Sequence, residues 1–588
     1  MLETAELSGC VITTAQTSQG LPLNKDPHTN TDPCSVDKNP ISVHRGTSKR
    51  QCDSQWSCSG VILDRSLGLV LCNGAIFFPF LKDRHKEFSV SNHNFLLPDD
   101  FISDLSIQVE FLSFRGTNDK SKDHLNNEET VQSLGLGLIP ISDQTGLHKK
   151  QTVNEAKLLL LVSCPEFQLL FSKLFNKAEG WMFFSEEEKQ EYGELQKDLS
   201  HFHWFALLKL PGLLSTEQKK ISFMSALKLQ KGCEVFACGS PFGSFYPDIF
   251  LNTISKGVVS NITGDKNVVL LTDARCLPGS EGGGIFAADG NHLHLVGIIV
   301  APLCWKANEW VGLTLACSAN NILDNIMKHI YRTNILEKNN MTSINLLESC
   351  GTKKLNVSKT KDLIGAVVLV DSGQVWGSGI LIDPKIVLTC RHVITSASRV
   401  LVKIRQPKME KFQKLRGKVV FSTQETSPYD VAVIELEEPF PGIPQPVLAQ
   451  EYYTGMDVLV WGYGAFGENC GPSVTCGVLS SVISVGDVPV MLQTTCAVHG
   501  GSSGGPIFTA QTGELLGIVA SNTRDNATRA TYPHLNFSIP ISIFRRALQR
   551  FKLSGDLSSF QELNNVSRAV RNVWRLQRNP EKVLPSKL

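Results

Sequence analysis

Residues 495–508 read TCAVHGGSSGGPIF, a glycine-crowded turn with two serines that leads into an apolar run. Glycines on both sides of Ser503 let the backbone adopt turn conformations that a side chain would obstruct. Such a turn can hold a hydroxyl beside backbone N–H groups that face a developing negative charge, as acyl transfer requires. The stretch therefore predicts a nucleophile at Ser503, followed by a core strand that begins at Ile507.

Two upstream segments supply partners for a serine nucleophile. Residues 376–393 read as two short strands around a turn, and His392 closes the second strand. Asp430 opens an apolar segment, DVAVIEL, that reads as a buried strand. Either residue alone is commonly structural or part of a turn. Their chain order of His392, Asp430 and Ser503 is one of the known orders of a Ser-His-Asp triad, so these three are the predicted catalytic residues.

The segment 359–551 resembles a trypsin-fold serine protease of the HtrA/Deg kind. Four stretches carry the resemblance: Thr389-x-x-His392-Val393, Asp430-Val-Ala-Val, Gly501-x-Ser503-Gly-Gly-Pro and Asn536-Phe-Ser-Ile-Pro-Ile. The resemblance implies two packed β-barrels with the triad in the cleft between them, where His392 exchanges a proton with Ser503 and Asp430 orients the imidazole. It also implies an oxyanion hole formed by the backbone N–H groups of Gly501 and Ser503.

The same resemblance indicates which residues form the specificity pocket. The position six residues before the serine, at the base of the pocket, is Ala497. The wall segment that contains Ala520 and Asn522 adds no carboxylate. Cleavage after Lys or Arg is therefore not expected, and a small or neutral residue such as Cys, Ala, Ser or Met before the scissile bond fits better.

Residues 54–330 read as a second, degenerate copy of the protease domain. The copy has Gly74 in place of the histidine, Trp204 in place of the aspartate and Glu281 in place of the serine. None of the three can do the chemistry of the residue that it replaces. This half is expected to be inactive, and to pack on the other half, regulate it or hold substrate. An unrelated β-rich domain is the alternative.

The predicted fold is all-β, with two trypsin-like double β-barrel domains in tandem, the N-terminal one degenerate, and with a helical linker and a C-terminal helix. The predicted parts are a mobile N-terminal tail (1–50), the degenerate domain with insertions (51–330), a linker (331–358), the active protease domain (359–551) and a C-terminal tail (552–588).

Bulk composition argues against several classes of function. Among 588 residues, 57 basic side chains against 56 acidic ones give a net charge of +1, which offers no broad attraction to nucleic acid or anionic membrane. No apolar run is long enough to span a bilayer, and the N-terminus lacks the pattern of a secretory signal. The 16 cysteines include no Cys-x-x-Cys pair, so reduced thiols are expected, with no metal and no cofactor.

The last three residues, Ser586, Lys587 and Leu588, have the form of a peroxisomal import signal that a receptor reads. They predict a location in the peroxisomal matrix, with the import receptor as a partner. Together with the two halves, this ending resembles peroxisomal processing proteases.

That resemblance implies removal of N-terminal leader peptides from imported precursor proteins and processing of some β-oxidation enzymes. It also implies self-association and self-cleavage. A general peroxisomal quality-control protease and a non-enzymatic chaperone or scaffold are the alternative hypotheses.

Overall fold

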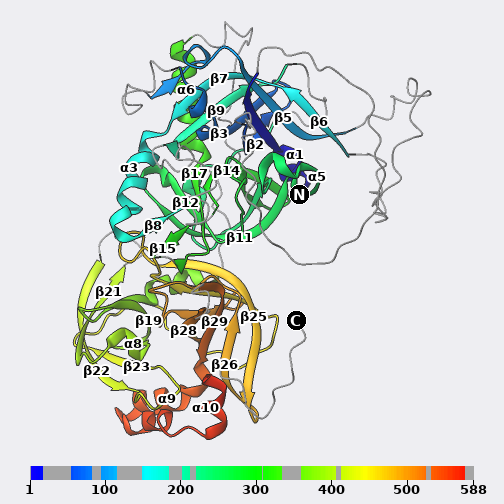
Figure 1. Cartoon of the computed structure of the whole chain (residues 1–588). Coiled ribbons are helices and arrows are strands. Elements are labelled where there is room, and N and C mark those ends of the chain that lie inside the picture. Colours follow the sequence, from blue (N-terminus) through cyan, green and yellow to red (C-terminus); the bar gives the residue numbers. More distant parts are fainter. Residues whose placement is uncertain are drawn as a thin grey trace, which may run out of the picture.

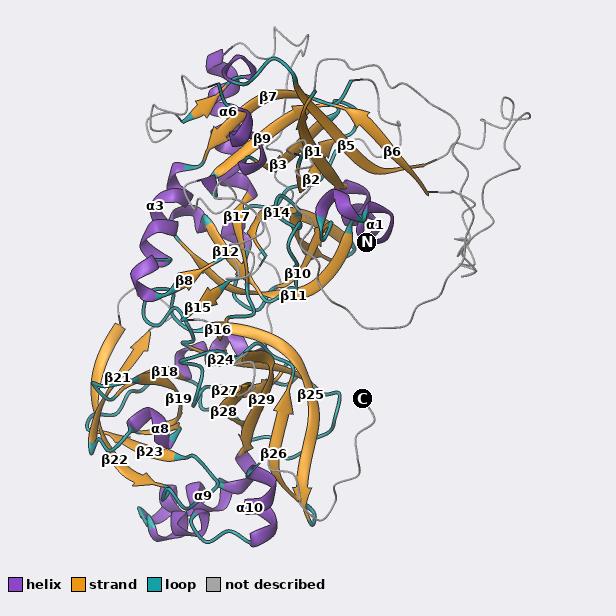
Figure 2. Ribbon diagram, viewed as in Figure 1, coloured by secondary structure: helices purple, strands orange, loops and turns teal. Residues whose placement is uncertain are grey.

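The computed structural model describes residues 2–17, 55–82, 94–114, 149–183, 201–211, 220–302, 304–307, 309–333, 359–405, 412–524 and 531–575. They form two halves, the first above the second in the view of Figure 1. Both halves consist mainly of strands, with short helices around them (Figure 2). The predicted all-β tandem architecture is confirmed. The predicted signal at Ser586, Lys587 and Leu588 lies outside the described residues.

The second half contains two closed six-stranded barrels. In each barrel the strands follow the ring order first, second, third, sixth, fifth and fourth, as expected for a trypsin-like fold. The first barrel consists of β18 (Val367–Asp371), β19 (Trp376–Asp383), β20 (Ile386–Thr389), β21 (Arg399–Arg405), β22 (Phe412–Ser422) and β23 (Ala432–Leu436). The second consists of β24 (Asp457–Gly462), β25 (Ser473–Val485), β26 (Val488–Thr494), β27 (Pro506–Thr509), β28 (Leu515–Arg524) and β29 (Thr531–Pro540).

The first half repeats this architecture. Its closed barrel has the same ring order once two inserted strands are set aside. The barrel strands are β10 (Glu234–Gly239), β11 (Thr253–Thr263), β12 (Val269–Thr272), β13 (Gly284–Asp289), β14 (His292–Ala301) and β17 (Thr314–Ser318), and the insertions are β15 (Trp305–Lys306) and β16 (Glu309–Trp310), of which β15 pairs with β8 (Trp181–Met182).

The other sheet of the first half has eight strands in the order β4-β7-β9-β3-β2-β1-β5-β6. Ala156 alone separates β6 from β7 in the chain, so the two sides of the sheet come together as in a barrel whose fifth strand is split. The strands are β1 (Gly9–Gln16), β2 (Trp56–Asp64), β3 (Leu69–Asn73), β4 (Phe95–Leu96), β5 (Leu105–Phe114), β6 (Lys149–Glu155), β7 (Lys157–Ser163) and β9 (Trp204–Lys209).

The prediction of a mobile tail over residues 1–50 is wrong at its start. Residues Leu2–Ser8 form helix α1, and β1 follows directly. β1 lies between β2 and β5, which is the place that β18 takes between β19 and β21. The run Cys10-Val-Ile is fully buried because it completes the barrel-like sheet. Residues 18–50 lie outside the described part of the chain.

The prediction of a tail from residue 552 is wrong as far as residue 575. Helix α9 (Arg545–Ser554) continues into a 3₁₀ helix, Ser558–Leu563, and into α10 (Arg568–Trp574). Phe560 and Leu563 are buried in the core of the second half, and Trp574 Nε1 donates a hydrogen bond to Val490 O at 3.1 Å. Helix α6 (Ala319–Thr333) is amphipathic and packs its apolar side into the first half, and it overlaps the predicted linker only at residues 331–333. Residues 334–358 are not described.

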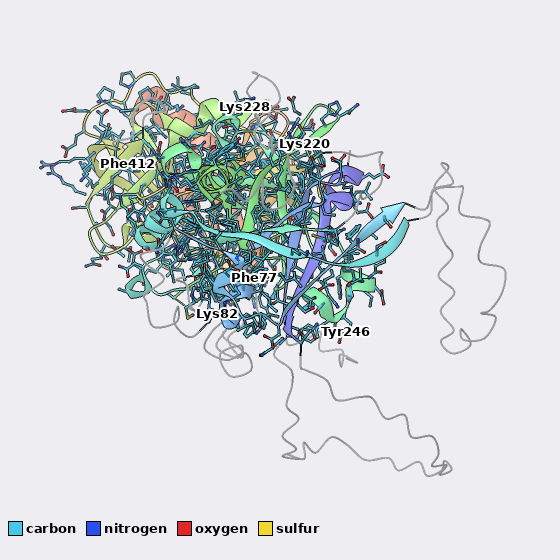
Figure 3. The ribbon with its side chains drawn as sticks, turned by 90° about the horizontal axis from the view of Figure 1, so that it is seen from above. Phe77, Lys82, Lys220, Lys228, Tyr246 and Phe412 are labelled. Atoms are coloured by element: carbon cyan, nitrogen blue, oxygen red, sulfur yellow. The ribbon has the colours of Figure 1, made fainter. Side chains whose placement is uncertain are left out.

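Most of the apolar core of each half comes from that half, but the largest cluster of the first half also includes Ala465, Phe466 and Cys470 of the second half. Figure 3 shows the side chains from above: Phe77 lies in the interior, whereas Tyr246 lies at the edge of the first half, where it is exposed. The remaining helices are short: α3 (Pro165–Leu174), α5 (Pro247–Phe250) and α8 (Arg391–Ile394). No helix among the described residues is both long and apolar enough to cross a membrane.

The two halves meet along β11 and β25, which lie side by side (Figure 1). Asn261 Nδ2 donates a hydrogen bond to Ser473 Oγ at 2.8 Å. Across the same contact the backbone N–H of Cys476 donates to the buried carboxylate of Asp273 at 2.5 Å. Buried polar bonds of this kind fix the register of the two halves, because an unpaired buried polar group would be costly.

Candidate active site

His392 and Asp430 are brought together by two neighbouring strands. β20 ends at Thr389, and the short helix α8 follows at once and carries His392. β23 begins directly after the segment that holds Asp430, and it is the antiparallel neighbour of β20. The end of one antiparallel strand lies beside the start of the next, so the two side chains meet at the same edge of the barrel.

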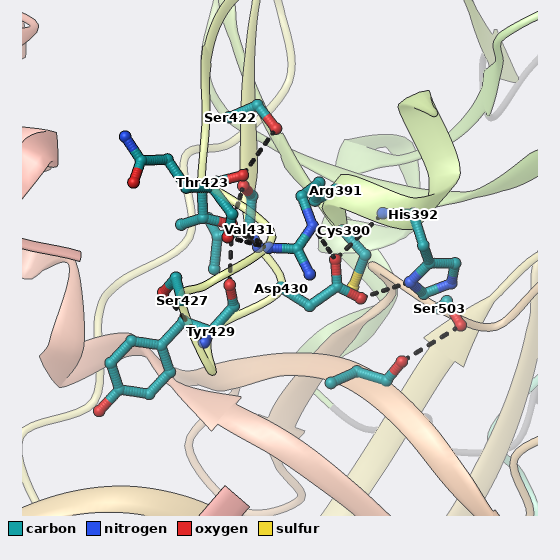
Figure 4. Close-up of polar contacts among 12 residues, drawn as sticks. Cys390, Arg391, His392, Ser422, Thr423, Ser427, Tyr429, Asp430, Val431 and Ser503 are labelled. Carbon is teal, nitrogen blue, oxygen red and sulfur yellow. Dashed lines mark hydrogen bonds and ion pairs between the residues drawn. The ribbon is translucent and has the colours of Figure 1, made fainter. Parts of the chain in front are cut away.

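The Asp430 carboxylate holds the imidazole of His392 (Figure 4). It accepts a hydrogen bond from His392 Nδ1, and a second from the His392 backbone N–H at 3.0 Å. Burial alone would raise the pKa of Asp430, but the His392 hydrogen bonds and the nearby Arg391 charge outweigh it, so the pKa is lowered. The carboxylate therefore stays ionised at neutral pH. The imidazole is fixed through Nδ1, and half of the His392 side chain (51%) is exposed.

Ser503 follows a turn whose shape depends on Gly501. The carbonyl of His499 accepts a hydrogen bond from the N–H of Ser502 at 2.9 Å, which closes a four-residue turn with Gly501 at φ 90°. The third position of a type II turn needs this positive φ, which favours glycine. In the described part of the chain, the N–H groups of Gly501 and Ser503 donate no hydrogen bond, so both can serve an oxyanion.

The hydroxyl of Ser503 points to strand β28 of the second barrel. Its Oγ donates to the carbonyl of Ala520 at 3.5 Å, and no hydrogen bond to His392 is present among the described residues (Figure 4). Rotation about the Cα–Cβ bond to another staggered position moves a serine hydroxyl without backbone change. Catalytic hydrogen bonds commonly tighten only when substrate binds.

Ser378 in β19 ties the serine loop to the first barrel. Its N–H donates to Ser503 O at 2.8 Å, and its Oγ donates to Gly501 O at 2.7 Å. The same Oγ accepts a bond from the N–H of Tyr463 at 2.8 Å. Through its N–H and its buried hydroxyl, Ser378 thus joins the nucleophile, the oxyanion turn and the residue that follows β24, so both barrels hold the loop.

Of the three predicted pocket residues, Ala520 is the one that bonds to Ser503. Ala520 and Asn522 are on β28, and Ala520 provides the carbonyl that accepts from the serine. Ala497 is buried, and Gly312 of the first half packs against it: a Cβ built on Gly312 would lie 3.1 Å from the Ala497 Cβ. The first half therefore contacts the residue that is predicted to form the base of the pocket.

Sequence reasoning missed the contribution of the first half to this region. A Cβ on Gly500 would lie 3.7 Å from Glu309 Oε2, and the ring of Trp310 packs edge-on against His534 at 5.5 Å between centroids. These residues are almost two hundred positions before the serine loop, in the short inserted strands β15 and β16 and their connections. Nothing in their spacing points to the site, and only the packing of the halves reveals them.

One group of metal-ligating types lies at the triad. The donor atoms of Cys390, His392 and Asp430 lie within 4.8 Å of one another. However, the Cys390 thiol is fully buried and donates to Val519 O at 3.2 Å. Burial raises the pKa of this thiol well above its usual value, so it stays protonated. The His392 and Asp430 atoms already bond to each other, so the arrangement serves acid-base chemistry better than metal binding.

The first half keeps the serine loop but fills it with a carboxylate. Glu281 takes the place of Ser503: its carbonyl accepts from Ser59 N at 2.9 Å, and Gly279, two residues before it, has φ 94°. In the second half, the carbonyl of Ser503 accepts from Ser378 N at 2.8 Å, and Gly501 has φ 90°. Glu281 Oε2 accepts a 2.7 Å hydrogen bond from the N–H of Gly279, the donor that matches Gly501. The degenerate oxyanion hole is thus occupied from within.

Strand pairing fixes the other two degenerate positions. Cys72 pairs with Ala206 in the first half as Thr389 pairs with Ala432 in the second. Trp204 lies two residues before Ala206, as Asp430 lies two residues before Ala432, so the buried Trp204 matches Asp430, as predicted. Ala75 lies three residues after Cys72, as His392 lies three residues after Thr389. Ala75 therefore matches His392, and the predicted match to Gly74 is wrong by one residue. Neither alanine nor glycine can accept a proton, and the conclusion that this half lacks a triad is unchanged.

His499 makes the serine loop sensitive to acid. Its Nδ1 accepts a hydrogen bond from the N–H of Ala465 at 3.0 Å, and burial lowers its pKa to about 4. The unfolded chain takes up this proton near pH 6.5, so the stabilising effect is complete above that pH and is lost as the pH falls. Between pH 8 and pH 5 we expect His499 to account for about 2 kcal/mol of lost unfolding free energy. Urea unfolding of wild type and His499→Asn, which keeps an acceptor in the same place, measures this difference; equal losses would contradict it.

Comparison with known proteins places the chain among proteases. The family of trypsin-like peptidase domains matches residues 377–518. A peroxisomal leader peptide-processing protease from Mus musculus is 46% identical over 547 residues, which cover 91% of this chain and 94% of the relative. The protein of that name from Homo sapiens is 45% identical over 545 residues, with the same two coverages of 91% and 94%.

A third relative matches about a third of the chain. A probable periplasmic serine endoprotease of the DegP-like kind from Pseudomonas savastanoi is 30% identical over 191 residues, or 32% of this chain and 36% of the relative. This match supports an HtrA-like serine protease. Since the two mammalian relatives match across nearly their whole length, the chain belongs to the family of peroxisomal leader peptide-processing proteases and is a serine endopeptidase.

Proposed function

We propose that this protease removes N-terminal leader peptides from enzymes imported into the peroxisomal matrix and also processes some β-oxidation enzymes, with His392, Asp430 and Ser503 as its catalytic triad. One observation carries the proposal: the half that resembles HtrA proteases keeps the His392–Asp430 pair beside an open serine loop, in a chain 46% identical to a protease named for leader processing. The other half has lost all three groups.

The proposed mechanism uses the groups in the order that the geometry allows. Ser503 Oγ attacks the carbonyl carbon of the scissile bond as His392 Nε2 takes its proton. The N–H groups of Gly501 and Ser503 stabilise the oxyanion, a type of donor whose loss typically costs about 3–4 kcal/mol. His392 then gives its proton to the leaving amine. In deacylation His392 takes a proton from a water molecule, which attacks the acyl carbon, and then returns the proton to Ser503 Oγ. Asp430 stabilises the imidazolium throughout.

The proposed specificity is for a small or neutral residue before the scissile bond. Ala497 at the pocket base has no charge, and Ala520 presents only a methyl group and its carbonyl. A neutral pocket gives a basic side chain no partner for its charge, which would make its burial unfavourable. Asn522 adds a polar amide to the same wall.

The proposed partners beyond the substrates are the import receptor and other copies of the chain. The receptor would recognise Ser586, Lys587 and Leu588. Self-association and self-cleavage follow from the family resemblance. We also propose the domain division of a degenerate half and an active half, with the active half extended to residue 575.

The leader-processing proposal predicts a single cut. Purified protein is incubated with a peroxisomal precursor that carries its N-terminal leader, and the products are read by intact mass. We expect two products whose masses sum to the precursor plus one water, with a small or neutral residue at the end of the leader. The matched Ser503→Ala variant should leave the precursor whole. A precursor that stays intact with the wild-type protein would contradict the proposal.

The same measurement tests the alternatives. A general quality-control protease shares every catalytic residue, but it would degrade an unfolded precursor to a ladder of short peptides. A scaffold without activity would leave all substrates unchanged. A sharp single junction on a folded precursor favours processing.

A further inference from the structure

We propose that the degenerate half positions the oxyanion hole of the active half, and that Lys306 is its main positioning residue. The connection runs through residues 463–472, which we call the bridging loop, between β24 and β25. The loop belongs to the active half by sequence, but it is held largely by the other half.

The bridging loop touches the oxyanion turn directly. The N–H of Ala465 donates to His499 Nδ1 at 3.0 Å, and His499 opens the turn that sets Gly501 at φ 90°. A Cβ on Gly464 would lie 1.9 Å from the His499 ring, so loop and imidazole are packed without space between them. A shift of the loop must therefore move the imidazole, and with it the first residue of the oxyanion turn.

The degenerate half holds both ends of this loop with lysines. Lys306 Nζ donates to the carbonyl of Ala465 at 2.5 Å, on the same residue whose N–H holds His499. At the other end, Lys231 Nζ donates to the carbonyls of Cys470 and Pro472 at 2.8 and 2.7 Å. A charged donor such as the Lys306 ammonium bonds a carbonyl more strongly than a neutral donor does. Burial lowers the pKa of Lys231 to about 7, so this amine is only partly charged at neutral pH, and Lys306 is the stronger of the two holds.

Apolar packing fixes the middle of the loop. Ala465, Phe466 and Cys470 are buried members of the apolar core of the first half. The Phe466 ring stacks on Trp181 at 5.1 Å between centroids and meets Phe175 edge-on at 5.8 Å. Lys306 Nζ in turn lies 5.0 Å from the centroid of the Trp181 ring. The core of the degenerate half thus extends into the active half at this loop.

The equivalent loop in the degenerate half has no such role. It starts at Ser240, whose N–H donates to Ser59 Oγ as Tyr463 N–H donates to Ser378 Oγ. Three of its aromatic residues, Phe242, Phe245 and Tyr246, are exposed, and Figure 3 shows Tyr246 at the surface. In the described part of the chain, lysines of the other half hold only the bridging loop of the active half. This asymmetry is expected if one half has become the support of the other.

The test uses the full chain and a fluorophosphonate probe, which reacts with Ser503 and places a phosphonyl oxygen in the oxyanion hole. Neither the leader-processing role nor the identity of the substrate enters this assay. We expect Lys306→Met to lower the maximal inactivation rate, kinact, by at least about tenfold, toward the roughly 10²–10³-fold effect of losing one oxyanion donor. The half-saturating probe concentration should stay within about twofold of wild type, because ground-state binding is not affected.

Two further variants make the result decisive. Lys306→Arg keeps a charged donor and should recover most of the rate. Lys266→Met removes an exposed lysine of the same half that pairs with Asp324, and should leave labelling unchanged. Melting temperatures are measured for each; if Lys306→Met is unfolded at the assay temperature, Lys306→Gln replaces it under the same criteria. A normal kinact in the Lys306 variant, or a loss that appears only as a lower melting temperature, would overturn the proposal.

Discussion

Replacing Ser503 with alanine is expected to lower kcat for peptide hydrolysis by roughly 10⁶-fold, with KM within about twofold of the wild-type value. The hydroxyl is the group that forms the acyl-enzyme, and no other side chain at the turn can replace it. The rate that remains should reflect the oxyanion hole and substrate binding alone. Hydrolysis of the precursor under single-turnover conditions measures the effect.

The adjacent serine provides a matched control for this prediction. Ser502 is buried in the turn, and it contributes to the loop through its backbone. Its N–H donates to His499 O, and its carbonyl accepts from Gly505 N at 2.9 Å. Ser502→Ala keeps both of these bonds and should retain activity within about tenfold, the cost of a modest loss of packing. If Ser502→Ala and Ser503→Ala lose activity equally, the assignment of Ser503 as the nucleophile is contradicted.

Replacing Asp430 with asparagine is expected to lower kcat by about 10⁴-fold while leaving the fold intact. The carboxylate accepts from both the ring Nδ1 and the backbone N–H of His392. An asparagine can present its NH₂ group to Nδ1, which favours the tautomer with the proton on Nε2, and that nitrogen can then no longer accept a proton from Ser503. The pH dependence of single-turnover hydrolysis measures the loss across pH 6–9.

Asp383→Asn is the control for the aspartate. Asp383 pairs with Lys552 at 3.7 Å, away from the cleft and partly exposed. A surface pair of this kind contributes about 0–1 kcal/mol, so activity should not change. An Asp430→Asn protein with more than a tenth of wild-type kcat would show that the carboxylate does not support the imidazole.

The local parts of the site were readable from the sequence. The glycines around Ser503, the strand that ends before His392, the strand that begins after Asp430 and the chain order of the three residues predict groups that lie near one another in Figure 4. These features depend on residues close in the chain and on turn chemistry, which leave a clear pattern. The copy in the first half was readable for the same reason, through Trp204 and Glu281.

Features that depend on register or on long-range packing were not readable. The predicted match of Gly74 to His392 came from aligning Cys72 with Cys390, and these two cysteines are not equivalent in the structure. The turn after β2 is longer than the turn after β19, so strand pairing moves the match to Ala75. Strand β1 was missed because a short apolar run followed by a polar stretch resembles a tail until its neighbours β2 and β5 are known.

Contacts between the halves left no signal in the sequence. Lys306, Glu309 and Gly312 lie in short inserted strands and their connections, where no periodicity marks a site. Their importance follows from the pseudo-symmetric docking of β11 on β25, which places the insertion beside Ala497 and Gly500. Charge and burial at such a contact are properties of the assembled molecule.

The most direct test of the account is the site of covalent labelling. The full-length protein is treated with the fluorophosphonate probe, digested, and mapped by mass spectrometry. The account predicts one modified residue, Ser503, and no adduct in residues 1–333, where Glu281 fills the degenerate oxyanion hole. Label on Ser502, label in the first half, or label that persists in Ser503→Ala would contradict the assignment of catalysis to the second half.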